Sequence, residues 1–353
     1  MYKFKSTIKD LNGGYAIDYT QAADAHKKLK AAFVCVDFPN KKAEDSQHPD
    51  IDFYYNLLAA DGLRVFNTIS YGKLDLEIVI FDQWFTMLKN DEDYNMSRVI
   101  TGECQRAYIK DAMDVTCDVV DYSQFDILYI VPVHGSAVPY SPTMVDASHP
   151  VICKNGEKIG LAVTFGNDMY TRKGLLLAHE TGHIMGLPDL YTYGVTEGAK
   201  DAFGHCGTWD LMGWIEGIAP DYIAYSKWRL GWLDDEQFAT ANESGEYQLT
   251  PVETAEGLKG VVIPLDEYHG YIVEYRQPLG LDVNLPEEAV LVYRIDGTIH
   301  SGKGCITLIP PQEEMYLQID RDKLDGIVRA GETVSRDGIS VTSLGNGRIK
   351  VER

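Results

Sequence analysis

Short apolar runs divide the first half of the chain into predicted strands. Residues 31–38 (AAFVCVDF) and 126–133 (DILYIVPV) are apolar over most of their length, which is typical of strands buried on both faces. Residues 74–81 (LDLEIVIF) alternate between apolar and polar side chains, as a strand with one wet face does. Residues 159–165 (IGLAVTF) form a further short strand immediately before the stretch 174–191. The pattern therefore predicts a sheet in this half of the chain.

Two longer stretches between these strands have a helical pattern. Residues 50–70 place apolar side chains on one side, and Asp50 or Asp52 can cap the N-terminus of this helix. Residues 97–120 contain a second long helix. Residues 135–150 are rich in Pro and Ser and are expected to form an exposed loop. Strands and helices that alternate in this way up to residue 185 predict an α/β sandwich.

The pattern changes near residue 241, where short strands separated by turn residues take over. These strands are expected at 247–252, 258–265, 271–276, 290–295 and 306–309, followed by a hairpin that pairs 339–344 with 348–352. Asn346-Gly347 lies between the last two strands and is a strong signal for a tight turn. We interpret 241–353 as a smaller, all-β, sandwich-like domain, 31–240 as a preceding α/β domain, and 1–30 as a leader or the remnant of a pro-region.

Composition and charge narrow the range of partners. The chain has 353 residues, of which 45% are hydrophobic and 24% charged, so it can form a large core and two domains. Its net charge of −21 argues against nucleic acid and against anionic membranes, because both attract basic surfaces. No apolar run reaches the length of a membrane span. The first residues, MYKFKSTIKDLNGG, lack the apolar core of a signal peptide.

The six cysteines define neither a metal site nor a disulfide framework. No C-x-x-C pair occurs, so a second, cysteine-based zinc site is not expected. Cys104 and Cys117 could pair, but a connectivity does not follow from sequence. Calcium is a secondary expectation, because Asp and Asn are plentiful but no D-x-[DN]-x-[DN]-G loop is present.

Candidate chemistry is concentrated in residues 174–191 (GLLLAHETGHIMGLPDLY), which contain the pattern H-E-x-x-H-x-x-G-x-x-D. His179 and His183 are four positions apart, so a helix would place both imidazoles on one face. This spacing suits two nitrogen ligands of one zinc ion. Glu180 follows the first histidine, where its carboxylate can act as general base toward a water on the metal. The alternative is a solvated helix with two incidental histidines. The apolar residues around the motif instead predict a buried helix, whose polar groups need partners.

The residues after this helix can supply a third ligand. Gly186 can end the helix because glycine takes the left-handed conformation of a sharp turn, and Pro188 prevents the helix from resuming. The chain can then return Asp189 to the ion and leave a fourth position open for water, as in catalytic zinc sites. Glu197 is the alternative third ligand.

At these residues the sequence resembles the immune inhibitor A family of bacterial zinc metallopeptidases, which are related to the metzincins. HETGHIMGLPDLY is similar to the zinc motif of this family. Residues 207–213 (GTWDLMG) are similar to its Met-turn, whose methionine, here Met212, lies under the metal site. Residues 225–233 resemble the helix and turn that close the catalytic domain. Weaker similarity covers much of the remaining chain, at 34–39, 70–74, 270–277 and 290–296.

The resemblance implies a metzincin-like catalytic domain over 31–240, with one zinc ion held by His179, His183 and Asp189. Many metzincins use a histidine as the third ligand. The resemblance to the immune inhibitor A family is what favours an aspartate, Asp189, with Glu197 as the alternative. Glu180 would take a proton from the zinc-activated water and pass it to the leaving amine.

Several residues around the motif keep two interpretations. Trp214 stands where some metzincins carry a tyrosine that assists the transition state, so His205, Tyr191 and Tyr193 are candidates for that role. Asp210 either orients a ligand histidine or is a plain turn residue. In related peptidases an edge strand before the zinc helix pairs with the substrate, and 159–165 is either that strand or an internal one.

We therefore expect a zinc-dependent endopeptidase that hydrolyses peptide bonds of protein or peptide substrates. The alternative is a catalytically silent or narrow-specificity relative that serves as a binding or adhesion module, although a pure binder has no need of Glu180. The resemblance also implies secretion, whereas the sequence as given shows no export signal, so a cytoplasmic protein is the other reading. The sequence carries no signature of an oligomeric state.

Overall fold

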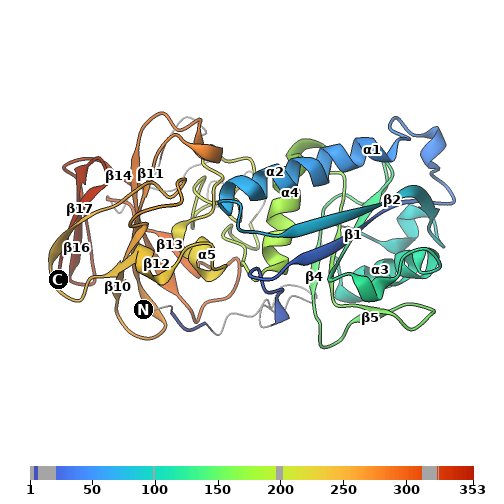
Figure 1. The fold of residues 1–353 in the computed structure, drawn as a ribbon, viewed down its shortest axis with the longest axis horizontal. Helices are drawn as coiled ribbons and strands as arrows, with labels where there is room; N and C mark the ends of the chain where they lie inside the picture. Colours follow the sequence, from blue (N-terminus) through green and yellow to red (C-terminus); the bar gives the residue numbers. More distant parts are fainter. Residues whose placement is uncertain (1–3, 7–20, 98–99, 196–201, 312–323, 325) are drawn as a thin grey trace. The chain divides into compact units, whose positions relative to one another are not determined.

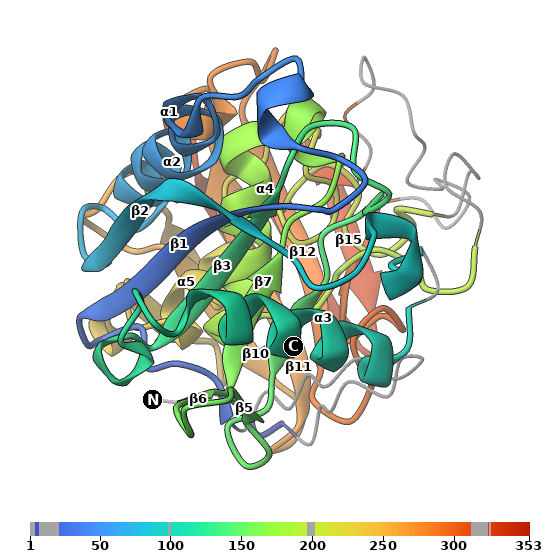
Figure 2. The same ribbon diagram turned by 90° about the vertical axis from the view of Figure 1, so that its right-hand side faces the viewer.

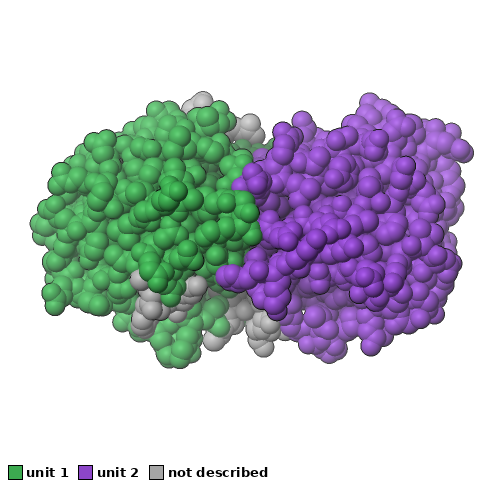
Figure 3. All heavy atoms as spheres, viewed as in Figure 1, with its two compact units in different colours: residues 1–8, 68–73, 188–353 green, residues 9–67, 74–187 purple. Residues whose placement is uncertain are grey.

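A computed structural model describes residues 4–6, 21–97, 100–195, 202–311, 324 and 326–353 (Figure 1). The chain forms two compact units, coloured separately in Figure 3. Unit 1 comprises residues 1–8, 68–73 and 188–353, and unit 2 comprises residues 9–67 and 74–187. Both contain β-sheets, and the fold as a whole is mixed α/β with few helices.

Unit 2 contains the following elements, in chain order: β1 (Leu29–Asp37), η2 (Ala43–Asp45), α1 (Ile51–Tyr54), the π-helical η3 (Tyr55–Ala60), α2 (Asp61–Ile69, whose end reaches unit 1), β2 (Leu76–Thr86), η4 (Asp91–Tyr94), α3 (Gly102–Thr116), η5 (Tyr122–Gln124), β3 (Ile127–Pro132), β4 (Thr143–Val145), β5 (Val151–Ile152), β6 (Lys158–Ile159), β7 (Leu161–Thr164) and α4 (Met169–Ile184). The predicted helices at 50–70 and 97–120 are therefore confirmed as α1 to α2 and as α3, with a π-helical stretch inside the first.

The main sheet of unit 2 has the strand order β2-β1-β3-β7-β4. Its first four strands are parallel, and β4 pairs antiparallel with β7. The predicted strands 31–38 and 126–133 are confirmed as β1 and β3, which are almost wholly buried because they lie inside the sheet. α3 covers one face, where Tyr108 packs in the same core as Val34, while η3 and α4 cover the other (Figure 2).

The position of β4 decides between the two interpretations of residues 159–165 and corrects the expectation for residues 135–150. Residues 161–164 form an internal strand, β7, between β3 and β4, so this strand offers no edge to a substrate. Residues 135–150 are not simply an exposed loop, because β4 lies within them and all its residues are buried. Pro and Ser content predicted a loop here, but pairing with β7 decides the structure of 143–145.

Unit 1 contains the remaining elements: α5 (Ala224–Arg229), η6 (Asp235–Gln237), β8 (Phe238–Thr240), β9 (Gly245–Gln248), β10 (Gly260–Pro264), β11 (His269–Arg276), η7 (Gly280–Asp282), β12 (Ala289–Asp296), β13 (Ile306–Leu308), β14 (Ile327–Val328), β15 (Thr333–Arg336), β16 (Ile339–Gly345) and β17 (Arg348–Glu352).

Two sheets of unit 1 share one hydrophobic core. One has the order β13-β12-β11-β10-β8, with β14 also paired to β12, and the other has the order β15-β16-β17-β9. Val273 of β11 and Val292 of β12 contribute to the same core as Val341 of β16 and Val351 of β17. The hairpin between β16 and β17 is confirmed, and its Asn346 and Gly347 have φ values of 51° and 72°. These left-handed conformations are what a tight hairpin turn requires.

The compact units divide the chain at 187/188, inside the stretch 31–240 that the sequence assigns to one domain. These units do not test the expected domain boundaries at 30/31 and 240/241, which stay a prediction. Most of the expected leader, 1–30, lies outside the described residues. No helix in the described part of the chain is long and apolar enough to cross a membrane. Cys104 and Cys117 are both free thiols, so the pairing that the sequence left open is not formed here.

Candidate metal centre

The helix that carries the histidines begins at a kink. Lys173, with φ 51° and ψ −135°, interrupts α4, so the segment with the motif starts at Gly174. The backbone N–H of Gly174 donates to Oδ2 of Asp61 at 3.0 Å, and Asp61 thus acts as a cap contributed by α2. Asp168 precedes the kink and makes no side-chain capping bond.

α4 is buried against its own unit over the length of the motif. Thr181 Oγ1 lies 2.7 Å from the hydroxyl of Tyr129 on β3, which fixes the helix to the sheet. Gly174 packs so closely on α2 that an added Cβ would overlap the backbone of Asp61 and Gly62. The position of the motif is therefore set by the sheet on one side and by α2 on the other.

His179 and His183 lie on one face of this helix, as their spacing predicts. Each is only 4% exposed, and the ring centroids are 4.8 Å apart. Nδ1 of His183 lies 2.8 Å from the carbonyl oxygen of Leu187, so Nδ1 carries the proton and donates. The lone pair of that ring is then on Nε2, which is the form that a metal ligand needs.

The helix ends as the sequence predicts. Gly186 has φ +95°, its N–H donates to the carbonyl of His183 at 2.9 Å, and Leu187 N–H donates to the carbonyl of Gly182 at 2.9 Å. These two bonds are those of a Schellman motif, which reverses the chain after a left-handed glycine. Leu187 therefore both completes the turn and orients the ring of His183.

Asp189 follows this turn and is held by two hydroxyl groups. Its side chain accepts a hydrogen bond from the hydroxyl of Tyr193, and its backbone N–H donates to Ser301 Oγ at 2.9 Å. The Tyr193 hydroxyl also lies 3.1 Å from Ser301 Oγ. Tyr193, one of the three candidates for a transition-state helper, thus contacts the expected third ligand. Ser301 could not be found from sequence, because 112 positions separate it from Asp189.

One ligand atom from each of His179, His183 and Asp189 lies within 4.8 Å of the others, and all three residues are buried. Two imidazole nitrogens and one carboxylate oxygen form a donor set that suits zinc. A group of three or more His, Cys, Asp or Glu side chains close enough to hold a metal ion occurs at this one place within the described residues. Calcium remains a prediction, and Glu197, the alternative ligand, lies outside the described residues.

Glu180 is buried, and one of its carboxylate oxygens contacts β4. It is 7% exposed, and its Oε2 accepts a hydrogen bond from Thr143 Oγ1 at 2.6 Å. Burial raises the pKa of the Glu180 carboxyl, while the nearby His179 and His183 and the Thr143 hydrogen bond act in the opposite direction. Thr143 was missed from sequence because it lies in the stretch that reads as an exposed loop.

The segment 207–213, which is similar to a Met-turn, is hydrogen-bonded to the chain next to Asp189. Met212 is fully buried, and its carbonyl accepts the N–H of Leu190 at 2.9 Å. Asp210 Oδ1 accepts the N–H of Met212 at 2.7 Å, and Oδ2 accepts the N–H of Ile223 at 2.8 Å. Burial raises the pKa of Asp210 to about 7. Asp210 therefore has the turn-forming role that the sequence left open, because both carboxylate oxygens bind backbone.

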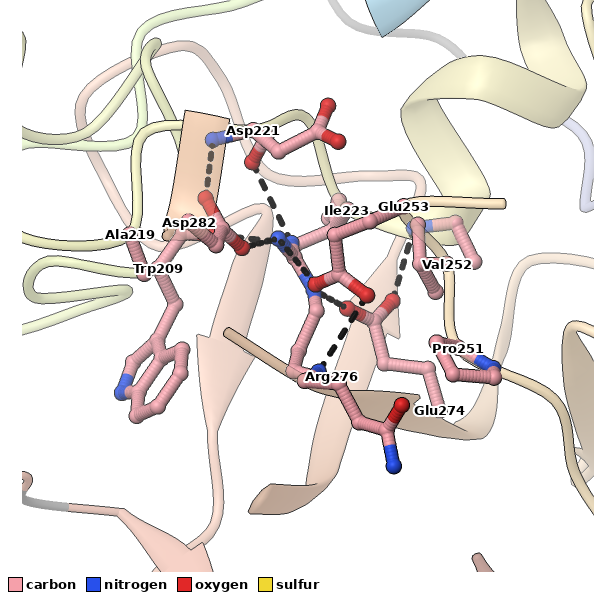
Figure 4. Close-up of polar contacts among 12 residues, drawn as sticks. Trp209, Ala219, Asp221, Ile223, Pro251, Val252, Glu253, Glu274, Arg276 and Asp282 are labelled. Atoms are coloured by element: carbon pink, nitrogen blue, oxygen red, sulfur yellow. Dashed lines mark hydrogen bonds and ion pairs between the residues drawn. The ribbon is translucent and has the colours of Figure 1, made fainter. Parts of the chain in front are cut away.

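A buried arginine supports the same segment from the β-rich part of unit 1 (Figure 4). Arg276 Nε donates to Glu274 Oε1 at 2.7 Å, and Nη1 donates to Asp282 Oδ2 at 2.5 Å. Nη2 donates to the carbonyl oxygens of Trp209 at 3.0 Å and Asp221 at 3.2 Å. Because Trp209 belongs to the segment 207–213, this guanidinium ties that turn to β11.

Trp214 and His205, which the sequence places near the motif, both pack against other parts of the chain. Trp214 stacks on Phe203 with ring centroids 4.8 Å apart. His205 is largely enclosed, and burial lowers its pKa, with a smaller effect from Lys303. The residue that would assist a transition state stays a prediction.

Comparisons with known proteins do not name a family. No family model and no curated protein matches the chain. Among solved structures, catalytically inactive OgpA from Akkermansia muciniphila, in complex with the O-glycopeptide substrate glycodrosocin, matches with a TM-score of 0.23 and 10% sequence identity. The alignment covers 86% of this chain and 96% of that one.

Proposed function

We propose that the protein is a zinc-dependent endopeptidase whose metal ligands are His179, His183 and Asp189. The observation that carries the proposal is the convergence of these three buried side chains within 4.8 Å, with Glu180 beside them on the same helix. A buried carboxylate between two ligand histidines is an arrangement that serves hydrolysis, because metal and base act on the same water.

When bound, the zinc ion supplies Lewis acidity that polarises a carbonyl and makes water a nucleophile near neutral pH. The chain's own residues have separate tasks. The Leu187 carbonyl orients His183 through its Nδ1–H. Tyr193 and Ser301 orient Asp189. Glu180 takes a proton from the attacking water at its carboxylate and then gives it to the leaving amine.

Substrate binding follows from the end of the sheet in unit 2. β4 is the last strand in the order β2-β1-β3-β7-β4, and it precedes α4 in the chain. An extended peptide can add to such an edge through main-chain hydrogen bonds. The role that the resemblance gave to residues 159–165 therefore passes to Thr143–Val145 in this proposal.

The proposal is tested by hydrolysis of casein with and without a zinc chelator, followed by addition of zinc. We expect activity that the chelator abolishes and zinc restores. Glu180→Gln should keep one equivalent of zinc and lose turnover, and Asp189→Ala should bind less zinc. Turnover in Glu180→Gln equal to that of the wild type would exclude the mechanism.

A binding or adhesion protein that retains the metal is the second candidate. It predicts one equivalent of zinc in the purified protein, no hydrolysis of unstructured proteins, and no effect of Glu180→Gln on either property. Secretion, which the resemblance implies, is part of the proposal and is tested by measuring the protein in the culture medium and the cell fraction of its natural host.

A further inference from the structure

Thr143 is the polar side chain of β4 that reaches the helix with the motif. It is 2% exposed, and its Oγ1 donates to Glu180 Oε2 at 2.6 Å. The same hydroxyl lies 3.3 Å from the backbone carbonyl of Glu180, a longer and weaker contact. A distance of 2.6 Å is typical of a hydroxyl that donates to an ionised carboxylate.

The backbone around Thr143 is fixed by contacts on both sides. Thr143 pairs with Val163 across the β4–β7 ladder. The carbonyl of the preceding Pro142 accepts the N–H of Thr164 at 3.0 Å and the side-chain amide of Gln105 at 3.1 Å. Since threonine is also β-branched and stiff at χ1, its hydroxyl has little freedom to move.

Glu180, by contrast, has three side-chain torsions and must hold one orientation to act as a base. A long, flexible side chain loses appreciable rotamer freedom when it is fixed, and a rigid partner reduces that loss at the moment of reaction. Because Thr143 occupies Oε2, the other oxygen, Oε1, is the one left to exchange the proton.

We infer that Thr143 is a positioning residue for the general base Glu180, and that it places Oε1 for proton transfer. The inference rests on the proposed function, since it assigns the partner of the proposed base. In this arrangement β4, the edge strand to which a substrate would add, also orients Glu180 through Thr143. Binding of a peptide along β4 and the orientation of Glu180 are therefore linked through one residue.

The test uses Thr143→Val, which keeps the shape and removes the hydroxyl, and Thr143→Ser, which restores a hydroxyl. Thr164→Val on the neighbouring strand is the matched control, because its Oγ1 is buried and makes no hydrogen bond within the described residues. Each variant is measured for kcat and KM on a peptide, for bound zinc, and for its midpoint of urea unfolding. Thr143→Ala replaces Thr143→Val if the latter does not fold.

For Thr143→Val we expect kcat to fall roughly 10- to 100-fold, the size of a lost hydrogen bond to a charged group, with KM and zinc content unchanged. Thr143→Ser should recover most of kcat, and Thr164→Val should match the wild type. A kcat within about twofold of the wild type in Thr143→Val would overturn the inference, while an inactive Glu180→Gln would leave the proposed function intact.

Crystal structures of the wild type and Thr143→Val give a readout that needs no activity. The inference expects a single Glu180 rotamer in the wild type and a displaced or divided one in the variant. An identical, single rotamer in both would overturn it even if the protein were a binder. Turnover retained by Glu180→Gln would instead remove the proposed function on which the inference rests.

Discussion

The carboxylate of Asp61 accepts the backbone N–H of Gly174 at 3.0 Å, although 113 positions separate the two residues. The bond is made where the kink at Lys173 ends and the helix with the motif begins. The first N–H groups of a helix have no partner inside it, and the positive end of the helix dipole favours a carboxylate there. α2 therefore supplies the cap that the sequence of α4 lacks.

We predict that Asp61→Ala lowers the free energy of unfolding by about 0.5–2 kcal/mol, the usual effect of losing an N-terminal cap. Urea unfolding followed by circular dichroism measures this change. Arg64→Gln is the matched control, because Arg64 is exposed and pairs with the other oxygen of Asp61 at 2.6 Å. A loss as large in Arg64→Gln as in Asp61→Ala would show that the ion pair, and not the cap, carries the effect.

Gly174 itself has no room for a side chain. Its added Cβ would overlap the backbone of Asp61 and Gly62, which cannot move aside as a flexible side chain would. We predict that Gly174→Ala destabilises the protein by roughly 1–3 kcal/mol, the range found for overpacking, despite the better helix propensity of alanine. Gly245→Ala on β9 is the control, because its Cβ would meet Tyr247 only at 3.5 Å or more. If Gly174→Ala were as stable as the wild type, α2 and α4 would not approach each other as described.

Sequence reasoning succeeded where the chemistry is local. His179 and His183 share a face because they are one helical turn apart, and Gly186 ends the helix through bonds that reach back only a few residues. Asn346-Gly347 likewise sets its own hairpin turn. Such features depend on neighbouring residues alone, so the printed sequence contains all that is needed to predict them.

The supporting residues could not be predicted, because each acts on a distant part of the chain. Thr143 lies in a stretch whose Pro and Ser content indicates a loop, and its contact with Glu180 exists only once β4 has joined β7. Arg276 reads as one charged residue at the end of a strand, although it binds the carbonyl of Trp209, which lies 67 positions away. Local pattern carries no signal for such contacts.

The two hydroxyl groups around Asp189 lead to a prediction about the metal. If Asp189 is a ligand, Tyr193→Phe and Ser301→Ala remove the groups that orient its carboxylate and its backbone. We expect each variant to bind zinc roughly 10- to 100-fold more weakly, as is usual when a partner of a metal ligand is removed. Competition with a chromogenic chelator measures the affinity, and Tyr247→Phe on β9 serves as a control for the loss of a tyrosine hydroxyl elsewhere in unit 1. Zinc affinity unchanged in both variants would argue against Asp189 as a ligand.

The buried carboxyl of Glu253 leads to a prediction about pH. Glu253 Oε2 accepts the N–H of Gln277 at 3.2 Å, while Oε1 makes no hydrogen bond within the described residues and lies 3.8 Å from Arg276 Nη1. Burial raises the pKa of Glu253 to about 9, although Arg276 opposes the shift. In the unfolded chain the group titrates near its ordinary pKa of about 4.3. The folded state therefore holds the proton more tightly between these two values.

The stability that the wild type gains from holding this proton is fully present below about pH 4. It is lost as the pH rises toward about 9. Glu253→Gln keeps the shape of the side chain and removes its titration. Relative to the wild type, the variant should gain stability between about pH 5 and about pH 8, at up to about 1.4 kcal/mol per pH unit. Tryptophan fluorescence during urea unfolding reports mainly on unit 1, which contains Trp209, Trp214, Trp228 and Trp232. Glu256→Gln, an exposed neighbour, should show no such trend. The prediction is wrong if the stability difference between the wild type and Glu253→Gln stays constant with pH. Arg276 would then keep Glu253 ionised in the folded protein.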